Sequence, residues 1–284
     1  MTSKAESISP AGEAPDVPPP SVSLRRIGAM VVRHWYLLTG SWPRLLDLFY
    51  WPLVQMLLWG FIQSYLATAR GMVAQAAGVL LGAALLWDVL FRSQVSLSIA
   101  FLEEIWSRNL GHLLVSPLRS GEFVASLVVV SLIRTLIGLT CASLLAIALF
   151  GFSLYDIGFG LVAFFFNLSV FGWAVGIAVS GLILRFGMGA EMLTWVLAAG
   201  LAPLCAVYYP IDALPHWLQW LPHVLPPAYI FEGMRGVLLH GVFRLDLLAA
   251  AVGLNLLYVT AGLALFMAML KVARRRGMLL QLGE

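Results

Sequence analysis

The sequence predicts an all-α, polytopic membrane protein with six transmembrane helices. Of its 284 residues, 61% are hydrophobic and only 11% are charged, whereas globular domains carry about 25% charged residues. Six apolar runs are long enough to cross a bilayer as helices, which takes about 20 residues. The predicted spans cover residues 45–66, 74–101, 123–150, 158–184, 192–209 and 247–270.

The two ends of the chain lack such runs. Residues 1–20 are rich in Pro, Ser and Ala and have almost nothing to bury, so we expect a disordered tail. Residues 21–276 form one transmembrane domain, and residues 277–284 a short C-terminal tail. We expect no cleavable signal peptide, because no early apolar segment is present. Cys141 and Cys205 both lie inside apolar runs, which argues against a disulfide framework.

An amphipathic, basic helix is predicted between the tail and the first span. Its apolar positions share one face at helical spacing: Leu24, Ile27, Val31, Trp35 and Leu38. Arg25, Arg26 and Arg33 lie mostly elsewhere. Such a helix suits the headgroup region of an anionic leaflet. We interpret it as an interface helix; an ordinary basic flank of the first span is the alternative.

The basic residues predict the orientation. Six crossings place both termini on one side, and that side would hold twelve of the 17 Lys and Arg residues. Three would lie on the other side, while Arg92 and Arg134 sit inside spans. The positive side is normally cytoplasmic, so both termini are expected in the cytoplasm.

A charged segment, residues 101–123, joins the second and third spans. Glu103, Glu104 and Arg108 are costly in hydrocarbon, so the chain must surface here. Leucines recur at helical spacing, and Pro117 would end a helix near Ser116. We interpret Glu103–Ser116 as a short cytoplasmic helix on which a soluble partner docks. A solvated helical connector is the alternative.

Three charges are predicted inside the membrane. Asp88 and Arg92 lie one turn apart on the second span, and Arg134 lies within the third. Unpaired, each would be expensive. We therefore expect an Asp88–Arg92 or an Asp88–Arg134 pair facing the bundle interior, and favour a structural tie over a proton relay.

The connection of residues 210–246 is too apolar for a free loop. Its prolines cut it into pieces too short to span, with aromatic anchors at Trp217 and Trp220 and a second helical piece at Ala228–Leu239. Segments of this length suggest re-entrant helices. Two helices lying flat on the outer leaflet are the alternative.

Several kinds of chemistry are not predicted. Neither lysine, Lys4 or Lys271, lies in a phosphate-binding loop, and no zinc-protease or serine-hydrolase motif is present. His216 and His223 have no Cys or carboxylate cluster around them, so no metal site is expected. The net charge of +3 reflects orientation in a bilayer rather than binding to nucleic acid.

Three motifs together resemble the membrane subunit of ABC-2 type transporters, a family that includes exporters of O-antigen and teichoic acid polymers, nodulation factors, and small drugs and lipids. The first is Glu103-Glu104 followed by Leu113-Leu114-Val115-Ser116-Pro117-Leu118. The second is Leu184-Arg185-Phe186-Gly187 followed by Glu191. The third is Tyr209-Pro210, Leu214-Pro215-His216-Trp217-Leu218, Pro226-Pro227 and Glu232-Gly233-Met234-Arg235-Gly236.

The resemblance implies a permease in a bacterial inner membrane. Two copies would work with two separate ATPase subunits, which would hold the ATP and Mg; this chain would need no cofactor. The residues expected to dock the ATPase, as a coupling helix, are Glu103, Glu104, Arg108, Leu113 and Pro117. The interface helix would touch the same subunit. The outer gate would contain Trp217, Trp220, Tyr229, Glu232 and Arg235. The first, second and fifth spans would line the translocation path between the two copies.

If the ATPase docks on the coupling helix, charge reversal at Glu103 and Glu104 is expected to uncouple ATP hydrolysis from transport without affecting folding. The substrate would be lipid-linked, a glycan or a hydrophobic molecule. One alternative is a secondary transporter or channel that needs no ATPase, although no internal repeat is evident. A lipid transferase is another, although it would need a carboxylate or histidine cluster that the sequence lacks.

Overall fold

A computed structural model describes residues 22–68 and 72–275, and every regular element in these ranges is a helix. The longer helices are α1 (Leu24–Thr39), α2 (Trp42–Ala67), α3 (Met72–Trp106), α5 (Ser120–Phe150), α6 (Phe159–Phe186), α7 (Met192–Leu204), α9 (Pro226–His240) and α10 (Leu245–Arg275). The short ones are α4 (Leu110–Val115), α8 (Trp220–Val224), η1 (Leu154–Ile157), η2 (Gly187–Ala190) and η3 (Ile211–Ala213). The predicted all-α class is confirmed.

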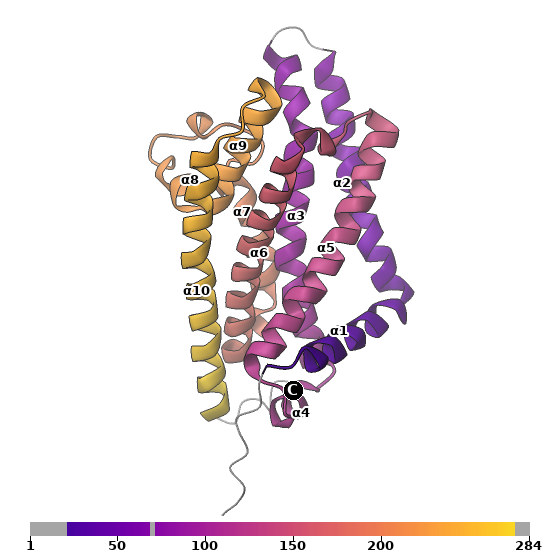
Figure 1. Cartoon of the computed structure of the whole chain (residues 1–284), viewed down its shortest axis with the longest axis vertical. Coiled ribbons are helices and arrows are strands. Elements are labelled where there is room, and N and C mark those ends of the chain that lie inside the picture. Colours follow the sequence, from indigo (N-terminus) through magenta and orange to yellow (C-terminus); the bar gives the residue numbers. More distant parts are fainter. Residues whose placement is uncertain (1–21, 69–71, 276–284) are drawn as a thin grey trace, which may run out of the picture.

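The long helices form an upright bundle, and α1 lies across its lower end (Figure 1). Helix α3 is central: 78% of its most apolar stretch is buried, against 22% for α2 and for α10. It packs on α6 through two small residues. A Cβ atom at Gly172 would lie 2.8 Å from the carbonyl oxygen of Leu90, and one at Gly176 would lie 3.0 Å from that of Gln94. Glycines at such positions let two membrane helices approach closely.

Five of the described helices are long and apolar enough to cross a membrane: α2, α3, α5, α6 and α10. The predicted fifth span, residues 192–209, instead contains the 13-residue helix α7. That helix ends directly after Pro203, which cannot donate a helical hydrogen bond. Ala206 then adopts a left-handed backbone with φ of 50°. The six-span count is therefore not confirmed.

The described ends of the chain lie together. Helix α10 ends at the lower end of the bundle, near α1 and α4 (Figure 1). Its Arg274 donates a hydrogen bond of 3.3 Å to Ser120, at the start of α5. Helices α8 and α9 lie at the opposite end. The predicted tails, residues 1–20 and 277–284, fall outside the described residues.

Candidate functional site

The end of α3 is buried and does not form a surface helix. Helix α3 continues to Trp106, and α4 is a separate element of six residues. Arg108 turns the chain between them with φ of 53°. Glu103 and Glu104 are only 6% and 0% exposed. The prediction of one docking helix over Glu103–Ser116 was wrong in its boundaries, because both carboxylates are used inside the bundle.

Glu104 joins three helices. Its carboxylate lies 3.0 Å from Arg33 Nη2 and 3.4 Å from His34 Nε2, both on α1. It also accepts a hydrogen bond of 2.9 Å from Asn109, directly before α4. Because the partners come from α1 and from the turn into α4, Glu104 fixes the end of α3 against both.

Glu103 joins α3 to two further helices. Its carboxylate lies 3.3 Å from Arg134 Nη2 of α5 and 3.7 Å from Arg44 Nε of α2. Helix side chains lean toward their own N-terminus, so those of Glu103 and Arg134, on antiparallel helices, lean toward each other. The proposed Asp88–Arg134 pair is therefore wrong. Asp88 pairs with Arg92 at 2.7 Å, as the alternative version predicted.

Glu122, at the start of α5, holds the first turn of α1. It accepts hydrogen bonds from Arg26 at 2.6 and 2.9 Å and from the backbone N–H of Ser23 at 2.8 Å. It also accepts one of 3.0 Å from the N–H of Arg119. The hydrogen bond to Glu122 raises the pKa of Arg26, so this arginine stays charged.

Helix α1 thus uses its charges differently from the prediction. Arg26 and Arg33 bind carboxylates of the bundle rather than facing outward; Arg25 is exposed. Met30, His34 and Leu38 form the buried face. Trp35, predicted on the same face as Leu38, is 45% exposed. The face of α1 that is buried against the bundle is rotated about the helix axis relative to the face that carries the apolar residues.

What remains exposed where α3 meets α4 is a small surface, here called the corner surface. It consists of Trp106, Ser107, Arg108, His112 and Pro117. Among the predicted docking residues, Arg108 and Pro117 belong to it. Leu113 is half-buried and packs on the lower part of the core.

A cavity of about 610 Å³ lies between α2, α3, α5 and α7, here called the inner cavity. All three predicted intramembrane charges line it. So do Glu103 and several residues that the sequence reading missed: Arg44, Asp47, Trp51, Trp87, Phe91 and Trp195. The sequence carries a signal of this lining only on α2. There the residues that line the cavity recur every three or four positions and so share one face of the helix: Arg44, Asp47, Trp51 and Gln55.

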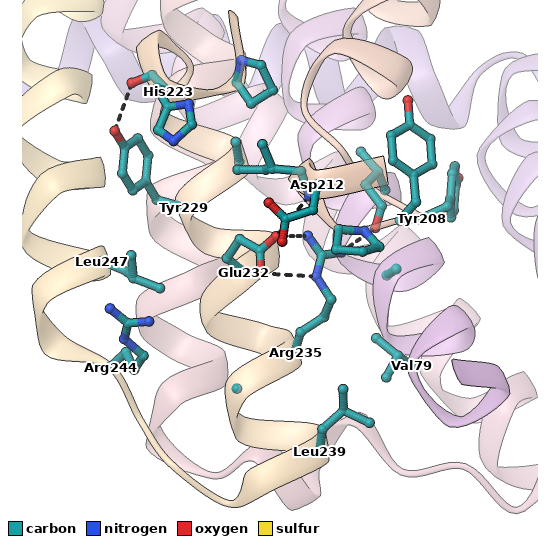
Figure 2. Close-up of a pocket in the computed structure, with 18 of the residues that line it drawn as sticks. Val79, Tyr208, Asp212, His223, Tyr229, Glu232, Arg235, Leu239, Arg244 and Leu247 are labelled. Carbon is teal, nitrogen blue, oxygen red and sulfur yellow. Dashed lines mark hydrogen bonds and ion pairs between the residues drawn. The ribbon is translucent and has the colours of Figure 1, made fainter. Parts of the chain in front are cut away.

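A second cavity, of about 830 Å³, lies at the opposite end beneath α8 and α9, here called the outer cavity. Figure 2 shows Glu232 and Arg235 of α9 paired in its lining, and Tyr229 next to His223, to whose carbonyl it donates a hydrogen bond of 2.8 Å. Trp217 and Trp220 do not line it and are 73% and 62% exposed. The structure therefore brings together three of the five predicted gate residues.

Arg235 organises the wall of the outer cavity. It lies 2.9 Å from Glu232 and donates hydrogen bonds of 3.1 and 3.2 Å to the carbonyls of Ala206 and Val207. These bonds attach α9 to the turn after α7 (Figure 2). Tyr208 and Asp212, which sequence reasoning missed, line the cavity from this turn and the segment after it. In the described part of the chain, no three metal-ligating side chains gather.

Comparison with known proteins decides the family. The family model described as ABC-2 type transporter matches residues 26–239, which is most of the chain. The chain belongs to the ABC-2 type transporter family. It is also 25% identical over 153 residues to ABC transporter G family member 20 of Dictyostelium discoideum. That match covers 51% of this chain and 20% of the relative, so the chain corresponds to a small part of that protein.

The family match places this ABC-2 chain among the multi-pass membrane subunits of ABC transporters. Such subunits normally work with an ABC ATPase subunit. The inner and outer cavities and the corner surface are then its candidate functional parts. Each is built mainly from residues within the matched range.

Proposed function

We propose that this chain is the permease subunit of an ATP-driven exporter. Two copies would form the translocation pathway, and a separate ATPase would bind each copy at the corner surface. The observation that carries the proposal is the attachment of this corner to the bundle. Glu103 and Glu104, in the last turn of α3, bind residues of α1, α2 and α5 and the turn into α4.

These contacts support a mechanical role for α3. A push on Trp106, Arg108 or His112 would act directly on the last turn of α3. The carboxylates of Glu103 and Glu104 would pass the motion to α1, α2 and α5. Packed helices have a few discrete arrangements rather than a continuous range. Closure of the ATPases would therefore bias the pair of permeases between two states of access.

The inner cavity supports a pathway along α2, α3 and α7. Helices α2 and α7 expose large apolar side chains, including Phe49, Tyr50 and Trp195. In the proposal, part of this surface faces the second copy and the rest faces lipid. The aromatic lining suits a lipid-linked, glycan or hydrophobic substrate.

The outer cavity would be the exit. We propose that α8 and α9 act as re-entrant helices that close this end, with Glu232 and Arg235 at the wall. Trp217 and Trp220 would anchor the segment at the outer headgroups, as exposed tryptophans commonly do. The membrane would be a bacterial inner membrane, with the corner surface and both termini on its cytoplasmic side.

The test is transport by the complete system in proteoliposomes. The chain is co-expressed with a candidate ATPase, purified by a tag on the chain, and assayed for ATP-dependent movement of substrate. The ATPase is expected to co-purify, and His112→Glu is expected to weaken both its retention and transport. His216→Glu, exposed at the opposite end, is the matched control. Transport that persists without any ATPase would identify a secondary transporter or channel instead.

A further inference from the structure

Two arginines in the inner cavity share a single carboxylate. Arg134 Nη2 lies 3.3 and 3.4 Å from the two oxygens of Glu103, and Arg44 Nε lies 3.7 Å from one of them. Charge-assisted hydrogen bonds are normally about 2.7–2.9 Å long. Asp88 and Arg92, about three to four helical turns from Glu103 along α3, line the same cavity and form such a bond at 2.7 Å. The Glu103 cluster is therefore loosely paired, whereas the Asp88–Arg92 pair is complete.

Arg134 also has an unused donor. Its side chain is only 9% exposed, and its Nε–H, which is buried, has no hydrogen-bond partner. A buried polar group without a partner costs about 1–3 kcal/mol. A guanidinium presents a flat fork of donors that matches a carboxylate or phosphate. Arg134 lines the cavity, so a bound anion could complete its hydrogen bonds.

The charges around Arg134 leave one competitor for a bound anion. The six charges that line the cavity cancel, since Arg44, Arg92 and Arg134 match Asp47, Asp88 and Glu103 in number. Asp88 is paired with Arg92. Asp47, like the 40% exposed Arg44, is open to solvent, where charges are screened more strongly than buried ones. An anion at Arg134 therefore competes with Glu103 alone, and tryptophans beside it offer an apolar surface.

We propose that the inner cavity binds a ligand with an anionic group, a phosphate or a carboxylate, held by Arg134 and Arg44. An apolar part of the ligand packs on Trp51, Trp87 and Trp195. The anion takes Arg134 from Glu103 and uses its free Nε–H. This inference rests on the proposed function, because it names the chemistry of the substrate that the permease would accept.

The test is equilibrium binding to the full chain in a neutral maltoside detergent, followed by tryptophan fluorescence and thermal shift. The probes are dodecyl phosphate, dodecyltrimethylammonium and inorganic phosphate. Dodecyl phosphate is expected to bind at least about tenfold more tightly than the cationic probe. Tighter binding than inorganic phosphate would identify a lipid-like ligand, and equal binding a soluble anion. Equal or tighter binding of the cationic probe would overturn the proposal.

Variants test the residues themselves. Arg134→Gln is expected to weaken dodecyl phosphate binding about tenfold or more, and Arg134→Lys to weaken it less. Glu103→Gln removes the competing carboxylate and is expected to strengthen binding, which a purely structural pair would not produce. Should Arg134→Gln not fold, Arg44→Gln, at a 40% exposed side chain, replaces it. Unchanged binding in the folded arginine variants would refute the proposal.

This measurement needs neither ATP nor an ATPase. Failure of the anionic probe to bind would leave the exporter proposal intact, because another substrate class could use the same path. Absence of a co-purifying ATPase would leave the binding result intact. The two proposals can therefore fail separately.

Discussion

The carboxylate of Glu104 in α3 lies 3.0 Å from the guanidinium of Arg33 in α1, and the Glu104 side chain is fully buried. This contact attaches the helix that lies across the lower end of the bundle to its central helix. The same carboxylate binds Asn109, where the chain turns into α4. The position of the corner surface therefore depends on one buried acidic group.

The first prediction concerns that group. Glu104→Gln keeps the shape of the side chain but leaves Arg33 without its counter-charge. We expect a loss of about 1–3 kcal/mol in stability, because Arg33 is partly exposed and can be hydrated. Thermal unfolding of the purified chain measures it. Asp156→Asn, at an exposed carboxylate, is the control and should unfold like the native chain; equal midpoints for all three would contradict the prediction.

A second prediction separates the intramembrane pairs. In a double-mutant cycle on stability, Asp88→Asn and Arg92→Gln should couple by about 1–3 kcal/mol, because either single change leaves one buried charge unpaired. Asp88→Asn and Arg134→Gln should couple by less than about 0.5 kcal/mol. Stronger coupling of Asp88 to Arg134 than to Arg92 would show that the pairing described here is wrong.

A third prediction concerns Gly138 in α5. A Cβ atom there would lie 2.5 Å from Arg92 Nε, so an alanine must displace the Arg92 side chain. Gly138→Ala is expected to cost about 1–3 kcal/mol, and the cost should fall in an Arg92→Ala background. Gly253→Ala is the matched control, since nothing lies within 4 Å of its Cβ position. Equal melting temperatures of the two alanine variants would argue against tight packing at Gly138.

A fourth prediction concerns the outer cavity. Arg235→Gln should release the carbonyls of Ala206 and Val207 and loosen the turn after α7. Hydrogen exchange in residues 205–214 should then speed up by tenfold or more, since about 1.4 kcal/mol corresponds to a factor of ten. Arg244→Gln, which removes an exposed pair with Asp246, should leave that exchange unchanged. Unaltered hydrogen exchange in Arg235→Gln would show that Arg235 does not hold the turn after α7 in place.

The apolar pattern was sufficient to predict the helical class and five of the six spans, because hydrocarbon allows few other structures for such runs. It failed at residues 192–209, where hydropathy continues but Pro203 and the left-handed Ala206 end the helix early. The boundaries of α9 were predicted within two residues, because prolines and Gly241 mark its ends.

Charge partners were harder to predict than helices. The acidic pair Glu103–Glu104 indicated a surface helix, since charges in hydrocarbon are costly. That inference fails when partners come from elsewhere in the chain: Arg33 and Arg44 lie about 60–70 residues earlier in the sequence. Local signals of pairing were carried by Asp88 and Arg92 on α3 and by Glu232 and Arg235 on α9, because the members of each pair lie one turn apart on the same helix.

The most direct test of the account is site-specific cross-linking between this chain and its ATPase. In a background without Cys141 and Cys205, a single cysteine replaces His112 in the corner surface or, as control, His216 at the opposite end. We predict that His112→Cys forms a cross-link to the co-expressed ATPase and that His216→Cys does not. A cross-link from His216→Cys alone, or none from His112→Cys while transport continues, would contradict the docking of the motor at the end of α3.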